Sequence, residues 1–131
     1  MFIFGGLRAS ITVSGSVATG CIVPTANQTL ITLCNGMGVT SISGAGVDIY
    51  TVTGGKKLYI TAISFSSDTG GNDQFGIFDN GTGGTAKFNG FSVTSQNQFI
   101  SLPSPISFAT KVTLASAGTK NYKYSLIGYE E

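Results

Sequence analysis

Residues 57–66 read KLYITAISFS, a stretch without glycine or proline that is rich in β-branched and aromatic residues. Successive side chains of a strand point to opposite faces, so the stretch can be divided into two sets. The sets are Leu58, Ile60 and Ala62 on one face, and Tyr59, Thr61, Ile63 and Phe65 on the other. Because both sets are largely apolar, we expect this strand to lie in the middle of a sheet with other elements covering both sides.

Similar stretches and turn signals recur every eight to twelve residues along the chain. Asp79-Asn80-Gly81 is the strongest hairpin signal, and Pro103-Ser104-Pro105 predicts a break in a ladder at an edge strand or a crossover. The pattern predicts an all-β, antiparallel two-sheet sandwich of jelly-roll type, with eight to ten strands and no substantial helix. Strands are expected near residues 9–17, 27–33, 47–52, 57–66, 75–78, 87–93, 99–102, 106–108, 112–114 and 122–126.

A chain of 131 residues has the length of one ordinary domain, so we expect a single sandwich over residues 1–131. Residues 46–131 are the expected core of that sandwich. Residues 1–45 are poorer in large apolar side chains and richer in Gly, Ser and Thr. They are expected to be either its first strands or an extended N-terminal arm that pairs with a neighbouring subunit.

Charge is scarce, because only 10% of the residues are charged and the formal net charge is +1. So weak a field argues against nucleic acid or an anionic membrane as a partner. A surface with few charges predicts coverage by neighbouring subunits, and a trimer is the favoured homo-oligomer. The other interpretation is that Ser, Thr, Asn and Gln make the surface polar enough alone. No signal peptide or apolar run of about 18 residues is seen, which predicts synthesis in the cytoplasm.

The residue types needed for catalysis are mostly missing. The chain has no histidine, which excludes a Ser-His-Asp triad and the usual zinc sites. Asp68, Asp73 and Asp79 lie in turn-rich segments where aspartate is favoured for backbone reasons. We therefore expect no enzyme activity, no cofactor and no metal. Cys21 and Cys34 are expected to be buried free thiols, with a disulfide across a hairpin as the other possibility.

Aromatic and N-terminal residues supply the candidate interface. The phenylalanines occupy alternating strand positions and are predicted to form the core, whereas tyrosines near the C-terminus could line an exposed patch. An apolar N-terminus could reach an adjacent subunit. The candidate interface residues are Phe2, Ile3, Phe4, Arg8, Tyr122, Tyr124 and Tyr129.

Three segments carry a resemblance to a known group of proteins. They are YTVTGGKKLYITAISFS at residues 50–66, LPSPISF at 102–108 and YSLIGYEE at 124–131. Over residues 47–131 the chain resembles small β-sandwich virion proteins of tailed bacteriophages, such as head decoration and minor capsid proteins. It departs from them at Thr53-Gly54, where Pro-Ala is common.

The resemblance implies a capsid decoration protein of the virion that binds the major capsid protein and stabilises the shell. Many weak contacts would add up on the repeated shell through multivalency. Three alternatives remain open: a small jelly-roll capsid protein, a receptor- or glycan-binding fibre tip, and a lectin-like module.

Overall fold

The computed structural model describes residues 27–68, 73–92 and 96–131, which form an all-β structure. Consecutive strands are joined by short turns and loops, as the spacing of glycines and polar residues predicts. The described strands are β1 (Thr29–Cys34), β2 (Thr40–Ile42), β3 (Val47–Thr51), β4 (Leu58–Ser67), β5 (Asp73–Asp79), β6 (Phe88–Ser92), β7 (Gln98–Phe108), β8 (Lys111–Ser116) and β9 (Lys120–Glu130).

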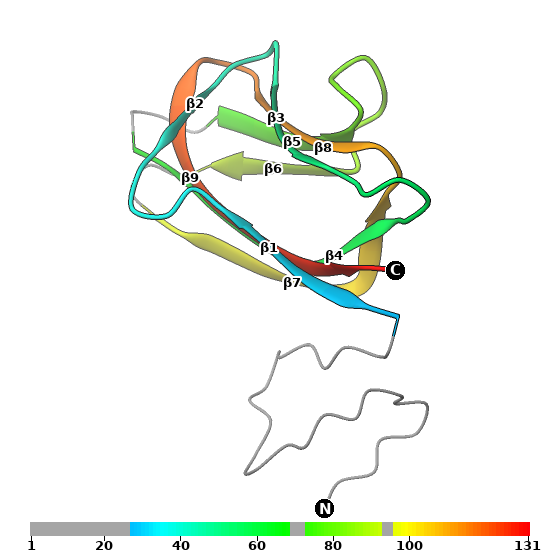
Figure 1. Ribbon diagram of the computed structural model, residues 1–131. Helices are drawn as coiled ribbons and strands as arrows, with labels where there is room; N and C mark the ends of the chain where they lie inside the picture. Colours follow the sequence, from blue (N-terminus) through cyan, green and yellow to red (C-terminus); the bar gives the residue numbers. More distant parts are fainter. Residues whose placement is uncertain (1–26, 69–72, 93–95) are drawn as a thin grey trace, which may run out of the picture.

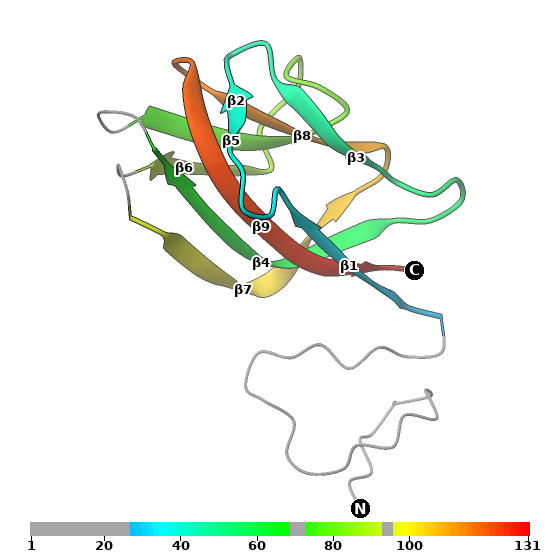
Figure 2. The same ribbon diagram turned by 60° about the vertical axis from the view of Figure 1, so that its left-hand side comes forward.

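The strands form two sheets that pack face to face (Figure 1). The first sheet has the order β1-β9-β4-β7, and β2 also pairs with β9; Figure 2 shows β9 running between β1 and β4. The second sheet has the order β3-β8-β5-β6, and every pairing in both sheets is antiparallel. From β3 onward the chain passes repeatedly between the sheets, which is the jelly-roll arrangement. The predicted two-sheet sandwich is confirmed.

The core between the sheets is built from aromatic and branched aliphatic side chains. The rings of Phe65 and Phe75 stack with centroids 4.6 Å apart, and Tyr122 lies 5.0 Å from Phe75. These contacts join the two sheets, because Phe65 and Tyr122 come from the first sheet and Phe75 from the second. The largest fully buried side chains are Tyr122, Phe65, Phe75, Phe108, Ile42, Leu58, Ile60, Ile63, Ile77, Leu114, Leu126 and Val112.

A β-bulge in β4 changes the predicted assignment of its faces. The register with both neighbouring strands shifts between Ile60 and Ala62, so Thr61 is an extra residue. One extra residue reverses the alternation, and the two halves of the strand therefore bury their apolar residues on the same side. The prediction that Ile63 faces away from Ile60 is wrong, and no second covering layer is needed to explain the strand. The inward side chains of β4, each at most 1% exposed, are Leu58, Ile60, Ile63 and Phe65.

The proline-rich segment lies in β7, an edge strand, as predicted. Opposite the bulge in β4, residues 102–105 bow out of the ladder, because Ile106 pairs with Ile60 and Ser101 with Ala62. Residues 29–42 supply β1 and β2 to the first sheet, so this part of the N-terminal region contributes strands. The strand predicted over residues 9–17 lies outside the described residues.

The predicted hairpin joins β5 to β6, with Ile77 paired with Phe88. Its connection is longer than a two-residue turn, and Asn80 and Gly81 both have positive φ, at 64° and 95°. Asparagine and glycine are the residues that adopt this conformation most readily. The loop therefore begins with a tight reversal and then extends over the second sheet.

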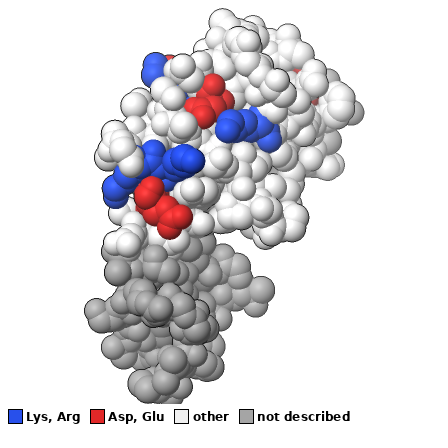
Figure 3. Space-filling view, turned by 90° about the vertical axis from the view of Figure 1, so that its right-hand side faces the viewer, with Lys and Arg blue, Asp and Glu red and all other residues white. Residues whose placement is uncertain are grey.

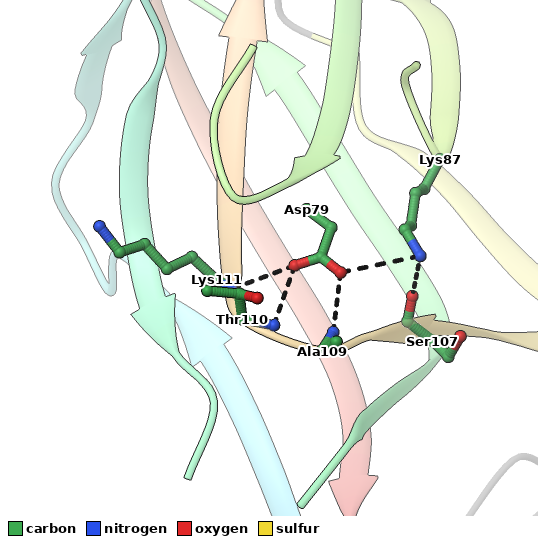
Figure 4. Close-up of polar contacts among 6 residues, drawn as sticks. All are labelled: Asp79, Lys87, Ser107, Ala109, Thr110 and Lys111. Carbon is green, nitrogen blue, oxygen red and sulfur yellow. Dashed lines mark hydrogen bonds and ion pairs between the residues drawn. The ribbon is translucent and has the colours of Figure 1, made fainter. Parts of the chain in front are cut away.

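Asp79, at the end of β5, connects this hairpin to the turn between β7 and β8 through hydrogen bonds (Figure 4). Its carboxylate accepts hydrogen bonds from the backbone amides of Ala109 (2.8 Å), Thr110 (3.0 Å) and Lys111 (3.1 Å). Lys87 Nζ lies 3.8 Å from the same carboxylate. Burial by itself raises the pKa of Asp79, but these amides and the lysine charge outweigh it and hold the pKa below its usual value. The part of the chain that the structure describes has no helix with the length and hydrophobicity needed to cross a bilayer.

Candidate assembly surface

The outer face of the first sheet is a broad surface made almost entirely of uncharged side chains. Paired residues of antiparallel strands point to the same side of a sheet, so the register defines three rows across this face. None of these three rows carries a charged residue, whereas the next pair of the register, Ser66 and Lys123, places an exposed lysine at one end of the face. The rows are Leu30, Tyr129, Tyr59 and Ser107; Thr32, Ile127, Ala62 and Ser101; and Cys34, Ser125, Ser64 and Phe99.

Several large side chains on this outer face are exposed to solvent. Leu30 is 50% exposed, Ile127 36% and Phe99 68%. The rings of Tyr59 and Tyr129 stack at 5.2 Å with an interplanar angle of 22°. Burial raises the pKa of Tyr129, and the nearby Glu131 carboxylate and Tyr59 raise it further, so the tyrosine stays neutral well above pH 7. An apolar and hydroxyl-bearing sheet face of this kind is typical of contact surfaces between proteins.

β1 borders the outer face as an edge strand, and it pairs with β9 alone among the described strands. Its sequence TLITLC contains no proline and no charge. Proteins usually protect such edges with lysine, proline or bulges, because an open edge can pair with another chain. On the opposite edge, Pro103 and Pro105 lack backbone donors and blunt the middle of β7. The edge formed by β1 is therefore the one better suited to pairing.

Two exposed phenylalanines lie on adjacent edge strands of the two sheets, along the side of the sandwich formed by β6 and β7. Phe91 on β6 is 65% exposed and Phe99 on β7 is 68% exposed. Gln98 Nε2 donates a 2.7 Å hydrogen bond to the Phe91 carbonyl oxygen and so ties the two edges together. The prediction that the phenylalanines form the core is wrong for these two and for Phe78, which lies on the outer face of the second sheet. Hydrophobicity alone does not distinguish them from Phe65 and Phe75, which point inward.

The predicted tyrosine patch is not assembled as expected. Tyr122 is fully buried, and its hydroxyl lies 3.2 Å from Ser92 Oγ and 2.9 Å from Ser116 Oγ. Its assignment to an exposed interface is wrong, because alternate residues of β9 that include Tyr122 point into the core. Tyr124 points the same way and is partly buried against the core, and burial raises its pKa. Tyr129 lies on the outer face, where its role at an interface stays a prediction.

The other predicted residues are placed as follows. The N-terminal candidates Phe2, Ile3, Phe4 and Arg8 lie outside the described residues, as does Cys21. Cys34 is exposed, so its predicted burial is wrong. It ends β1 and therefore lies at a corner of the outer face. The alternation of residues 29–34 carries a signal for this, because Cys34 shares a face with Thr32 rather than with Leu33.

Charged residues on the described surface occur in small groups of mixed sign. Figure 3 shows lysines and acidic side chains side by side on one face of the molecule. Lys111 Nζ lies 3.0 Å from Asp48 Oδ2, in the same region of the sandwich as Asp79 and Lys87. Asp73, one of the aspartates of the turn-rich segments, accepts a 2.9 Å hydrogen bond from the Gly118 amide. Among the described residues, no group of three or more His, Cys, Asp or Glu could hold a metal ion.

Comparison with known proteins gives a likeness of fold. No protein-family model and no curated protein matches this chain. A solved structure from the work "Bacillus endospore appendages form a novel family of disulfide-linked pili" superposes with a TM-score of 0.53. It has 14% identity and covers 88% of this chain and 96% of that one. The likeness shows that the two chains share a fold.

A second solved structure is that of the infectious bursal disease virus Gt strain. It has a TM-score of 0.35 and 10% identity, and covers 92% of this chain but 36% of that one. A likeness this low carries no argument about this chain.

Proposed function

We propose that the protein is a structural subunit of a multi-copy assembly and that it acts through contacts with neighbouring subunits, without catalysis. The proposal rests on the outer face of the first sheet, with its three uncharged rows and the edge of β1 that no other described strand covers. Water contact with Leu30, Ile127 and Phe99 is unfavourable, so covering them with another subunit stabilises an assembly. Strand addition at β1 would add directional backbone hydrogen bonds to that contact.

The proposal has two finer forms, and we favour an appendage built from copies of this chain. Two features support that form: the whole-length fold likeness to a chain from disulfide-linked pili, and the exposure of Cys34 at a corner of the outer face. A thiol in this position is accessible to a cysteine of another copy, and an extracellular oxidant would accept the two electrons released when the disulfide forms.

The second form is the capsid decoration protein, supported by the resemblance of residues 47–131 to phage virion proteins. In this form the partner is a major capsid protein, the favoured homo-oligomer is a trimer, and the protein is located in the virion. A decoration protein purified alone forms small closed oligomers or monomers, whereas an appendage subunit forms filaments.

The test is the mass of the full chain by light scattering, combined with negative-stain electron microscopy. We expect oligomers or filaments for the wild type. Ile127→Lys, which places a charge in the middle of the outer face, should shift the protein toward monomers. Thr85→Lys adds the same charge on an exposed loop away from this face and should leave the assembly unchanged. A wild type that is monomeric at all accessible concentrations and binds no capsid would refute the proposal.

The cysteine can be tested separately. If the appendage form is correct, non-reducing electrophoresis of assembled protein should show covalent multimers that Cys34→Ser reduces or abolishes. Assemblies that contain no intermolecular disulfide would refute the appendage form but leave the decoration form open, and particle-binding assays would then decide.

A further inference from the structure

The outer face of the second sheet carries a hollow of about 420 Å³. It lies on the opposite side of the sandwich from the outer face of the first sheet, which we call the assembly surface. It lies where the loop joining β5 to β6 extends over the sheet; this loop is light green at the upper right of Figure 1. The volume is within the range of pockets that bind small molecules, toward its lower end. The assembly surface does not include any residue of this hollow.

The floor of the hollow is made of residues with little or no side chain. Gly76 of β5 is paired with Ala115 of β8 and with Asn89 of β6. A Cβ atom on Gly76 would lie 2.9 Å from a ring carbon of Phe78 and 3.1 Å from Asn89 Oδ1. The missing side chain therefore lets the Phe78 ring and the Asn89 amide lean over the floor. The hollow is therefore shallow at Gly76, with the Phe78 ring on one side and the Asn89 amide on another.

The walls hold polar groups that have no partner within the described chain. The side-chain amides of Gln74 and Asn89 are both exposed and make no hydrogen bond to another described residue. Each amide offers two donor hydrogens and a carbonyl acceptor. The hydroxyl of Thr82, from the loop, adds another donor and acceptor opposite them. None of the described residues that line the hollow is charged.

We infer that this hollow binds a neutral sugar residue. Amides placed beside an aromatic ring match a pyranose, whose hydroxyls need donors and acceptors and whose C–H face packs on an apolar surface. A phosphate or carboxylate ligand would need a cation, which this lining does not provide. A purely apolar ligand would leave both amides without hydrogen bonds, at a cost in affinity. The inference does not depend on the proposed function, because the two surfaces share no residue.

The test uses saturation-transfer difference NMR on the full chain, because this method detects the sugar protons and tolerates large assemblies. The probes are glucose, galactose, mannose, N-acetylglucosamine and N-acetylgalactosamine, with the anionic N-acetylneuraminic acid as a charged comparison. We expect saturable transfer to at least one neutral sugar. Asn89→Ala and Gln74→Ala should each weaken the apparent affinity about tenfold, since each removes hydrogen bonds of the kind worth about 1.4 kcal/mol. Asn97→Ala, an exposed asparagine outside the hollow, is the matched control and should bind as the wild type does.

Three results would overturn the inference. The first is the absence of transfer to every neutral sugar, and the second is transfer that the Asn89→Ala and Gln74→Ala variants do not alter. The third is a change in assembly mass caused by Asn89→Ala without any sugar binding, which would assign the hollow to a second copy of the chain. The Ile127→Lys variant should still bind sugar, because Ile127 is not part of the hollow. Failure of the assembly proposal is therefore distinguishable from failure of the sugar-binding inference.

Discussion

Replacing Tyr122 with phenylalanine removes one oxygen atom from the centre of the core and leaves the shape of the ring unchanged. The lost hydroxyl lies 2.9 Å from Ser116 Oγ and 3.2 Å from Ser92 Oγ. Ser92 Oγ retains its 3.2 Å hydrogen bond to the Asp73 carbonyl oxygen. Ser116 is 2% exposed, and its hydroxyl has no other partner among the described residues, so it becomes a buried group without a hydrogen bond.

The cost of one such orphaned hydroxyl is about 2 kcal/mol of unfolding free energy. For a domain of this size, that corresponds to a fall in Tm of about 10 °C. The assay is urea unfolding followed by circular dichroism, with thermal melting as a second measurement. Tyr129→Phe is the matched control, because it removes the same atom on the outer face, and it should cost less than about 0.5 kcal/mol.

The double variant Tyr122→Phe with Ser116→Ala tests the cause. Removing the orphaned serine hydroxyl should restore part of the lost stability, so the two single effects should not add. If Tyr122→Phe cost no more than Tyr129→Phe, the hydrogen bonds of the Tyr122 hydroxyl would contribute nothing to the stability of the core.

Two further predictions concern a close contact beside the bulge in β4 and the buried carboxylate of Glu130. Gly128→Ala should lower the free energy of unfolding by about 3 kcal/mol, because a Cβ atom there would overlap the Tyr59 carbonyl oxygen. The measurement is urea unfolding. Gly83→Ala is the control, because a Cβ atom at Gly83 has no neighbour within 4 Å. The pKa of Glu130, which burial raises, is held below its usual 4.5 by hydrogen bonds from Thr53 and Tyr50. Its stabilising effect is therefore complete at neutral pH and is lost as the pH falls below about 4.5 and through the lowered value. Glu130→Gln should be less stable than the wild type at pH 7 and should show a shallower loss of stability on acidification; an identical acid profile would contradict the assignment.

Strand positions and the sandwich architecture could be predicted from the sequence because they depend on local alternation and on turn residues. The strand predicted over residues 57–66 lies within a residue of β4, and the prolines near residue 104 do lie in an edge strand. The orientation of faces could not be predicted. Thr61 has no feature that identifies it as the extra residue of a bulge, since the bulge follows from how β4, β7 and β9 are registered together.

The candidate surface was harder to predict, for a related reason. Strand alternation puts Tyr122 and Tyr124 on the same face of β9. The local sequence, however, does not indicate which face of β9 packs against the second sheet. Phe91 and Phe99 were indistinguishable from core phenylalanines until the register was known. The hollow beside Gly76 depends on how a loop lies over a sheet, and this is a tertiary contact between segments that share no sequence pattern.

The central position of β9 in the first sheet has a consequence for the timing of synthesis. β1, β2 and β4 all pair with β9, which is the latest of the described strands to leave the ribosome. Ile127 and Tyr129 of β9 also form the middle of the outer face. A nascent chain that has not yet released this strand has neither a closed sandwich nor a complete contact surface. If the subunits assemble through this face, as proposed, assembly cannot begin on the polysome before β9 has emerged, and folding and assembly are then separated in time.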